Sequence, residues 1–430
     1  MASTYLTRTF GSAGNRQSWT WSAWIKKTKI YGSSSSDREV WFGGYTASND
    51  TDWLEFGTEG DNFYYTTSDI SSEGNRLMRD PNAWFHAVVT YDGSNLKFYY
   101  NNELDFNNTS LSGNRGINVG GVHTIGAVAT NQSSRRFNGL MSHVHFVDGA
   151  VLAPTVFGET DSTTGEWKII TSPTVSSYGT NGFFILKDGN SVTDQSPNSN
   201  NFTANGTLTK TEDNPSNVFC TGNPLAIKNS PIFTNGNNTI AALGSSPYDV
   251  TTLGTLGMSS GKFYYEVKWR YGGNQSNQAF TTGITTSNQP PATNMSSGSY
   301  NNVWFNLNGG DLKKNNSDVG ADYPISVNSI VGFAWDLDNG TLKIHENGTY
   351  KNSGNAVVTG IPSDTYLPFF SPNGGTTTSI CDLNFGNGYF GTTAVATNSG
   401  NGYQDADGNG IFNYTVPTNY RALCTKGLNQ

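Results

Sequence analysis

The chain has 430 residues, of which 13% are charged, 35% hydrophobic and 13% aromatic. Charged residues reach about half of their usual share of ~25%, and Ala, Leu, Glu and Lys are too scarce for a helical bundle or a coiled coil. A charged disordered tail is also excluded, because so many aromatic side chains need somewhere to pack. With 50 Gly and 15 Pro, the composition indicates an all-β protein with many short strands and polar loops.

The charge distribution and the cysteines exclude several partners. The net charge is −8 and no run of Lys and Arg exceeds two residues, so no nucleic-acid partner is expected. The longest apolar stretches, such as residues 329–335, are too short to span a bilayer, and the N-terminus has no apolar signal core, so we expect neither membrane insertion nor Sec export. The three cysteines form no C-x-x-C pair, which argues against a disulfide framework and a thiolate zinc site.

Residues 1–158 have the rhythm of short strands. Residues 18–25 alternate aromatic and small side chains, as a half-buried strand does. Residues 84–91 predict a second strand, which a D-G-S-N turn connects to 96–100, and residues 137–147 predict a late strand. The motifs WTWSAWIKK, WFHAVVTYDGSNLKFYYNNEL and RFNGLMSHVHFVDGAVLAP resemble the laminin-G-like, concanavalin A-type jelly roll. That resemblance implies a β-sandwich.

Residues 159–225 predict a connector. They are rich in Thr, Ser, Asn and Asp and are interrupted by prolines. The stretch resembles a connector in structural proteins of phages and marine viruses, where it lies between a jelly roll and a second β module. We interpret it as a semi-ordered linker with one or two strands, of which Phe183–Lys187 is the best.

Residues 226–390 predict a second β module. In SSGKFYYEVKWR a turn is followed by a strand with four apolar residues on one face: Phe263, Tyr265, Val267 and Trp269. The segment SIVGFAWDLDNGTLKIHENGTYKN reads as strand, turn, strand and turn, and TYLPFFSPNG and CDLNFGN follow. Together these motifs resemble the SPRY domain. That resemblance implies a second β-sandwich, of a family that binds proteins through its loops.

Residues 391–430 predict a C-terminal docking segment. Phe412 and Tyr414 lie in a stretch too short to bury them alone, and exposed apolar groups usually mark an interface. The ending NYTVPTNYRALCTKGLNQ resembles one that follows SPRY-like modules in phage proteins. With the connector and the order of the modules, nearly the whole chain resembles virion proteins of bacteriophages of the marine or cyanophage type.

The resemblance implies a function at the virion surface. We expect a non-enzymatic structural protein, either a tail-fibre or appendage adhesin or a capsid-decorating protein. Its expected partners are other virion proteins, further copies of itself, and a glycan or protein of the host surface. Two alternatives stay open: a glycan hydrolase built on the jelly roll, and a SPRY-type protein-interaction adaptor.

Two motifs invite a catalytic interpretation. Residues 257–261 match G-x-S-x-G, but a strand and not a helix follows the serine, so we interpret them as a turn. Glu103 and Asp105 resemble the acidic strand of laminarinase-type glycosidases, whose chemistry needs two carboxylates on either side of the scissile bond. Asn107 and Asn108 stand where a third carboxylate would be needed. We therefore expect no catalytic residues.

Two sets of residues are candidate metal ligands. His143 and His145 flank Val144, so a regular strand places both on one face, where they could share a metal with Asp148 or simply face solvent. Residues 405–410 (DADGNG) have the opening spacing of a calcium loop, although position 12 is not the Glu that such a loop needs. Either Ca²⁺ or an ordinary turn fits this second set, whose oxygen ligands would come from Asp405, Asp407 and Asn409.

Aromatic and amide side chains near polar loops are candidates for a recognition surface. Aromatic rings stack on sugar rings, and loops on a rigid sandwich carry binding residues most often. The residues of this kind that lie among Asp, Asn, Ser and Gly are Trp41, Trp53, Tyr64, Tyr65, Tyr300 and Asn302.

Overall fold

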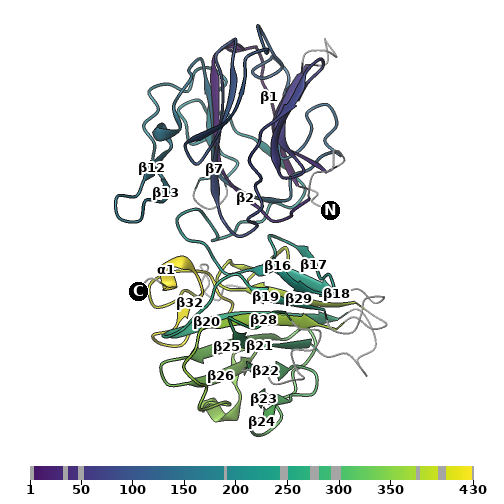
Figure 1. The fold of residues 1–430 in the computed structure, drawn as a ribbon, viewed down its shortest axis with the longest axis vertical. Coiled ribbons are helices and arrows are strands. Elements are labelled where there is room, and N and C mark those ends of the chain that lie inside the picture. Colours follow the sequence, from purple (N-terminus) through teal and green to yellow (C-terminus); the bar gives the residue numbers. More distant parts are fainter. Residues whose placement is uncertain are drawn as a thin grey trace. The chain divides into compact units, whose positions relative to one another are not determined.

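The computed structural model contains two compact units, one of residues 1–210 with 214–216 and one of residues 211–213 with 217–430. Each unit is built from antiparallel sheets (Figure 1), which confirms the expected all-β class with two β-sandwich domains. Helix in the described part is limited to α1 (Thr425–Leu428) and the short 3-10 turns η1 (Pro154–Val156) and η3 (Asn352–Gly354). The structure describes residues 4–31, 37–46, 53–187, 191–242, 250–271, 280–291, 302–373, 378–395 and 403–428.

The first unit pairs a seven-stranded sheet with a six-stranded sheet. The seven-stranded sheet, called the β3 sheet, has the spatial order β15 (Thr203–Asn205), β1 (Tyr5–Thr9), β10 (Val122–Ile125), β3 (Arg38–Tyr45), β4 (Trp53–Glu59), β5 (Asn62–Thr67), β6 (Ser71–Glu73). The six-stranded sheet, called the β2 sheet, has the order β14 (Phe183–Ile185), β11 (Gly139–Asp148), β2 (Trp19–Lys27), β7 (Phe85–Tyr91), β8 (Leu96–Tyr100), β9 (Glu103–Asn108).

Aromatic side chains from both sheets fill the first sandwich. Trp19 and Trp21 of β2 point inward and are fully buried, as the alternating pattern predicts. A bulge between Val40 and Phe42 lets the consecutive residues Trp41 and Phe42 of β3 both enter the same core. Burying each large apolar side chain is worth about 1.5–3 kcal/mol, so these rings dominate the stability of the unit.

The outer face of the β2 sheet is buried as well. Every residue of β2 is buried, because the chain after β11 folds back over this face with η1 and the hairpin of β12 (Gly158–Thr160) and β13 (Trp167–Ile169). His86 of β7 lies beneath the hairpin: Trp167 Nε1 donates to its Nδ1 at 3.1 Å, and its Nε2 lies 2.8 Å from Ser22 Oγ. Burial lowers the pKa of His86 to about 3, so the ring is neutral.

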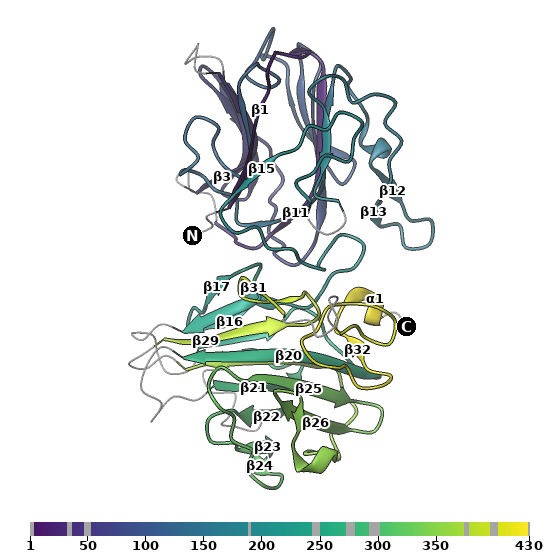
Figure 2. The ribbon, with the colours of Figure 1, turned by 180° about the vertical axis from the view of Figure 1, so that it is seen from behind.

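Residues 159–210, predicted as most of a connector, belong to the first unit in the structure. β15 pairs with β1 (Figure 2), and β14 pairs with β11. Phe183 and Phe202 are buried in the same core as the early tryptophans. The polar composition hides this role, because a few apolar residues spaced along a polar segment are enough to attach it to a sandwich.

The second unit pairs a seven-stranded sheet with an eight-stranded sheet. The first, called the β28 sheet, has the order β16 (Gly222–Lys228), β19 (Thr251–Gly254), β28 (Tyr366–Pro372), β21 (Phe280–Thr286), β22 (Asn302–Asn306), β23 (Leu312–Lys314), β24 (Ser317–Asp318). The second, called the β20 sheet, has seven strands in the order β17 (Ile232–Thr234), β18 (Thr239–Ala242), β29 (Ser379–Asn384), β20 (Lys262–Tyr271), β25 (Ile330–Asp336), β26 (Thr341–Glu346), β27 (Thr349–Tyr350). Its eighth strand, β32 (Arg421–Ala422), pairs with β20 outside this order. A small hairpin joins β30 (Tyr389–Phe390) to β31 (Thr393–Ala394).

The interior of the second unit follows the sequence pattern of β20. Phe263, Tyr265, Val267 and Trp269 all lie in the core between the two sheets, as predicted. The expected D-L-D-N-G turn connects β25 to β26. The sequence motifs that resembled a SPRY domain thus correspond to paired central strands of this sandwich.

The C-terminal segment is part of the second unit and not a free arm. β32 (Arg421–Ala422) pairs in parallel with β20 (Figure 2). Leu423 lies in the sandwich core, and Phe412 is fully buried in a separate cluster on the outer face of β20. The prediction that Phe412 is exposed for docking was therefore wrong, because the outer face of the sheet supplies the apolar surface that the stretch alone lacks.

Replacing Phe183 tests whether the predicted connector holds the first sandwich together. Phe183→Ala should lower the free energy of unfolding of the first unit by about 3–5 kcal/mol, since it empties a buried aromatic site. The control is Leu104→Ala on β9, where the side chain is 53% exposed and the change should stay within about 0.5 kcal/mol. Denaturant titration of the two variants gives the comparison, and equal midpoints would contradict the assignment.

Candidate functional site

The predicted recognition aromatics are mostly interior. Trp41 and Tyr65 are fully buried, and Tyr64 is 5% exposed beneath the Arg38 guanidinium, which lies 4.4 Å from its ring centroid. These residues sit inside β3 and β5 and not in loops, because the nearby Asp, Asn and Gly belong to the turns that connect the strands. Trp53 at the start of β4 is half-buried.

The two candidates in the second unit, Tyr300 and Asn302, do not form a recognition surface among the described residues either. Asn302 is buried at the start of β22, and Tyr300 lies outside the described residues. Among the described residues the exposed large apolar side chains are elsewhere. In the first unit they are Leu77, Leu104 and Val151, and in the second unit they are Leu225 and Ile227 of β16 and Ile232 of β17. β16 and β17 are edge strands of their sheets, so these three residues line the unpaired side of the second sandwich.

The acidic pair on β9 has a structural partner. Glu103 is exposed and forms an ion pair with the Arg76 guanidinium, and Asp105 Oδ1 accepts a hydrogen bond from Arg76 N at 3.0 Å. β9 is the edge strand of its sheet, so the two carboxylates hold a neighbouring loop. Ser259 is exposed in the turn before β20, as the turn interpretation predicts.

The two histidines of β11 are buried, contrary to the solvent-facing alternative. A register shift between Ser142 and His145 breaks the regular alternation, and His143 has φ 50°. His145 Nδ1 lies 2.9 Å from Tyr178 Oη, and its ring stacks on Phe184 at 3.9 Å. Burial lowers the pKa of His145 well below 6.5. Asp148, the third candidate ligand, instead accepts hydrogen bonds from Asn118, Asn181 and Asn15.

The carboxylates of the predicted calcium loop are used inside the chain. Asp405 Oδ1 accepts from Asp407 N and Asn409 N at 2.9 and 2.7 Å, and its Oδ2 accepts from Ala422 N at 2.9 Å. Asp407 Oδ2 accepts from Arg421 Nε at 2.6 Å, so a guanidinium supplies the positive charge at this turn.

In the described part of the chain no three His, Cys, Asp or Glu residues gather as metal ligands, and no helix there has the length and apolarity to cross a membrane.

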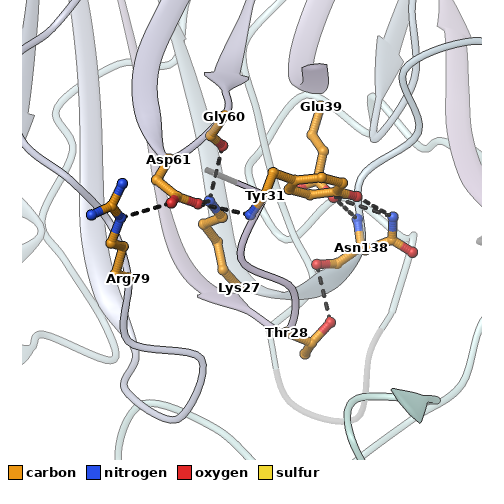
Figure 3. A network of polar contacts seen from close by, with 8 residues as sticks. All are labelled: Lys27, Thr28, Tyr31, Glu39, Gly60, Asp61, Arg79 and Asn138. Atoms are coloured by element: carbon orange, nitrogen blue, oxygen red, sulfur yellow. Dashed lines mark hydrogen bonds and ion pairs between the residues drawn. The ribbon is translucent and has the colours of Figure 1, made fainter. Parts of the chain in front are cut away.

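A buried ion pair closes one end of the first sandwich (Figure 3). Lys27 Nζ lies 3.1 Å from Asp61 Oδ1, and the two side chains are 1% and 0% exposed. The pair joins the two sheets, since Lys27 ends β2 and Asp61 lies in the turn between β4 and β5. Arg79 Nε donates to Asp61 Oδ2 at 2.9 Å, and Tyr31 N donates to Oδ1 at 3.1 Å. Burial acts to raise the pKa of Asp61, but these donors and the Lys27 charge outweigh it and lower the pKa below 3.8.

A second buried acid continues this network. Glu39 of β3 is 1% exposed, and its Oε1 accepts from Tyr31 Oη at 2.7 Å and from Asn138 N at 3.0 Å. Asn138 Nδ2 also donates to Tyr31 Oη at 2.9 Å (Figure 3). Burial raises the pKa of Glu39 above 4.5. These hydrogen bonds fix residues 28–31 and the chain around Asn138 at the end of the sandwich. The two acids of the network, Asp61 and Glu39, are buried.

The second unit contains a comparable network beneath its C-terminal segment. Glu266 of β20 is fully buried, and its carboxylate accepts hydrogen bonds from Asn413 N, Tyr414 N, Asn384 Nδ2 and Tyr264 Oη at 2.8–3.0 Å. Tyr264 Oη also lies 2.7 Å from His345 Nε2. Burial raises the pKa of Glu266 to about 7, against these hydrogen bonds, and burial lowers the pKa of His345 to about 4.

The two networks were not anticipated from the sequence. Lys27 follows an apolar strand, and Glu266 alternates with four core residues, so each looks like an ordinary solvent-facing position. One signal was present, in the apolar strand KFYYEVKW. Glu266 lies on the face of this strand that points away from the core, and if that face is also covered, the charge must have a partner. The predicted docking residue Tyr414 belongs to this network, because its N–H binds Glu266 and its ring contacts His345 at a centroid distance of 5.2 Å.

Comparisons with known proteins agree with the fold of the first unit. Residues 2–157 match the family described as the Concanavalin A-like lectin/glucanases superfamily. No curated protein matches the chain.

Solved structures similar to this chain include SPRY domains. The SPRY domain of human HERC1 shares 12% identity and a TM-score of 0.32, with 38% of this chain and 96% of that chain covered. The PSpry domain of TRIM65 shares 14% identity and a TM-score of 0.30, with 38% and 91% covered. Stonustoxin shares 16% identity and a TM-score of 0.30, and 39% of this chain covers 28% of that protein. At these values the likenesses carry no argument about function.

Breaking the buried ion pair should be far more costly than breaking an exposed one. Asp61→Asn leaves Lys27 charged and buried without a counterion, so the free energy of unfolding of the first unit should fall by about 3–5 kcal/mol. The matched control is Asp69→Asn. Asp69 pairs with Arg115 and its side chain is 56% exposed, so losing this ion pair should lower the free energy of unfolding by less than about 1 kcal/mol. In wild type this contribution is present above pH 3.8, the ordinary pKa of Asp61, and is lost as the pH falls below it. Equal losses in the two variants would contradict the account.

Glu266 and His345 should give the second unit opposite pH dependences. Since the pKa of Glu266 rises from 4.5 to about 7 on folding, its contribution is present below pH 4.5 and is lost as the pH rises through 7. The pKa of His345 falls from 6.5 to about 4, so its contribution is present above pH 6.5 and is lost as the pH falls through 4. Stability should therefore fall with pH in His345→Gln and rise in Glu266→Gln, as measured by denaturant titration from pH 4 to 7.5. Slopes of the same sign would refute this.

Proposed function

We propose that this protein is a non-enzymatic binding protein whose first sandwich contacts a glycan or a protein. The match of residues 2–157 to a superfamily of lectins and glucanases supports two possibilities, binding and hydrolysis. Both use a rigid sandwich as a platform, and they differ in whether a pair of acids faces the ligand.

One observation favours binding over hydrolysis. Glu103 and Asp105, the two acids that resemble those of a glycan hydrolase, lie on the edge strand β9, and both bind Arg76. Hydrolysis needs two carboxylates with open access to the sugar, and here the Arg76 guanidinium occupies Glu103 while the Arg76 N–H occupies Asp105. Binding without hydrolysis is therefore the function that the geometry of the first unit supports best.

We further propose that the protein is a surface component of a bacteriophage particle, as an appendage adhesin or a capsid-decorating protein. The support is the resemblance of the module order, the 159–225 segment and the C-terminal sequence to phage virion proteins. A chain of low charge, rich in Asn, Ser and Thr, presents a neutral hydrogen-bonding exterior, which suits contact with glycans. The alternative hypothesis, a SPRY-type adaptor, relies on the same second sandwich. It differs in the partner, which would be a protein other than a virion component.

Assembly with other virion proteins, and with further copies of this chain, is part of the proposal. The buried Phe412 cannot provide the contact, so it must come from another surface. The apolar side chains that remain exposed in the second unit, Leu225, Ile227 and Ile232, are better placed because they lie on unpaired edge strands.

Incubation with polysaccharides tests the choice between binding and hydrolysis. The purified protein should release no reducing ends from laminarin, agarose or capsular polysaccharide. A glycan array with the same preparation should show retention of at least one glycan class or, if the ligand is a protein, of none. Turnover that disappears in Glu103→Gln but persists in Glu73→Gln would establish a hydrolase and overturn the proposal.

Imaging of intact particles tests the location. An antibody against this chain should label the outside of purified phage particles at symmetric positions on the capsid or the tail. The control is a particle preparation from a phage strain that lacks the gene. Absence of the chain from washed particles, measured by mass spectrometry, would leave the adaptor alternative in its place.

A further inference from the structure

The outer face of β20 is covered by the end of the chain itself. Tyr264 and Glu266 point away from the sandwich core, because Phe263 and Tyr265 point into it. Both outward residues are nevertheless 0% exposed. Residues 403–422, here called the strap, lie over them and end in β32 beside β20.

Glu266 binds the strap through its backbone. Its Oε2 accepts from Asn413 N at 2.9 Å, and its Oε1 accepts from Tyr414 N at 2.8 Å, so one carboxylate holds two consecutive peptide groups. Asn384 Nδ2 and Tyr264 Oη donate to the same two oxygens from the sheet and fix their orientation. This arrangement recognises an extended main chain, whatever side chains it carries.

Two glycines of the underlying unit make room for the strap. A Cβ on Gly348, which has φ 84°, would lie 2.9 Å from the Tyr414 ring. A Cβ on Gly386 would lie 3.0 Å from the backbone of Gly410, where Ile411 N donates to Gly386 O at 2.8 Å. A side chain at either position would therefore collide with the strap.

The strap pairs with the sheet over a shorter length than the strands beneath it pair with one another. Its apolar residues Phe412, Val416 and Tyr420 form a cluster separate from the sandwich core. Its only strand pairing with the sheet, among the described residues, is the two-residue contact of β32. Beyond it, Leu423 is in the core and Thr425 N donates to Val218 O at 2.9 Å, so the chain is fixed again there. Segments with few core contacts open at lower free energy than the elements they cover.

We propose that the strap is a releasable intramolecular ligand of the second unit. It opens as one unit, hinged at Leu423, and uncovers a binding site for an extended peptide in which Glu266 holds two consecutive N–H groups. The occupant of the closed state is the strap, with Phe412 and Tyr414 on either side of the clamped Asn413. This inference is independent of the proposed function, since it concerns the second unit alone.

Hydrogen exchange on the full chain tests the opening. In wild type the amides of Ile411–Tyr414 should exchange together and at least about tenfold faster than those of β25. Glu266→Gln should speed their exchange by about a further tenfold or more, since it replaces one of the two oxygens that accept from Asn413 N and Tyr414 N by an amide NH2 group. The matched control is Glu346→Gln on β26, whose carboxylate binds Ser326 N and Lys351 and no strap residue, and it should leave strap exchange unchanged.

A second variant and a peptide keep the test independent of folding defects. Asp405→Asn leaves one oxygen for the three N–H groups, of Asp407, Asn409 and Ala422, from which the carboxylate accepts, and should also speed strap exchange without changing β25. A fluorescent peptide with the sequence of residues 409–416 should then bind the Asp405→Asn chain more tightly than wild type, and should lose this binding when Glu266→Gln is added. Strap amides that exchange at the rate of β25, equal effects of Glu266→Gln on strap and β25, or failure of the opened chain to bind the peptide would each overturn the proposal.

Discussion

Burial of both faces of the central strands is the constraint on which both units depend. A sandwich needs only the inner face of each sheet to be apolar, yet β2 is buried along its whole length and Tyr264 and Glu266 of β20 are buried on the outer face. The covering chain comes from the segment after β11 in the first unit and from the strap in the second. Each sandwich therefore has a third, irregular layer that covers its outer face. This layer can be polar in composition, because only a few of its side chains make apolar contacts with the sheet.

The third layer accounts for four of the buried ionisable side chains. His86, His145, Glu266 and His345 all lie on outer faces that the covering segments remove from water. A buried polar group must be hydrogen-bonded to avoid a penalty of about 1–3 kcal/mol, and each of these groups has partners from the covering chain or from its own sheet. The Lys27–Asp61 pair follows the same rule at one end of the first sandwich, where it joins the two sheets.

The sequence indicated the two sandwiches and their central strands, because alternating aromatic residues and Asp/Gly turns are local signals. It did not indicate the covering layer. Phe183, Phe202 and Phe412 are single apolar residues in polar segments, and nothing within such a segment shows that a distant sheet has an apolar outer face to receive them. For the same reason the sequence did not show that Trp41 faces the core, because a bulge in β3 decides its direction and leaves no periodic signal. The Asp405 turn was found, but Arg421, which supplies its positive charge, comes from a strand fourteen residues later.

Hydroxyl-radical footprinting of the intact protein tests the covering layer most directly. The outer-face aromatics Trp24 and Tyr264 are 3% and 0% exposed, as protected as the core residues Trp21 and Tyr265. The account predicts that, in brief labelling, all four are oxidised at rates near those of buried side chains and well below that of the half-buried Trp53. Oxidation of Trp24 and Tyr264 at the rate of Trp53, with Trp21 and Tyr265 still protected, would show bare outer faces and contradict the account.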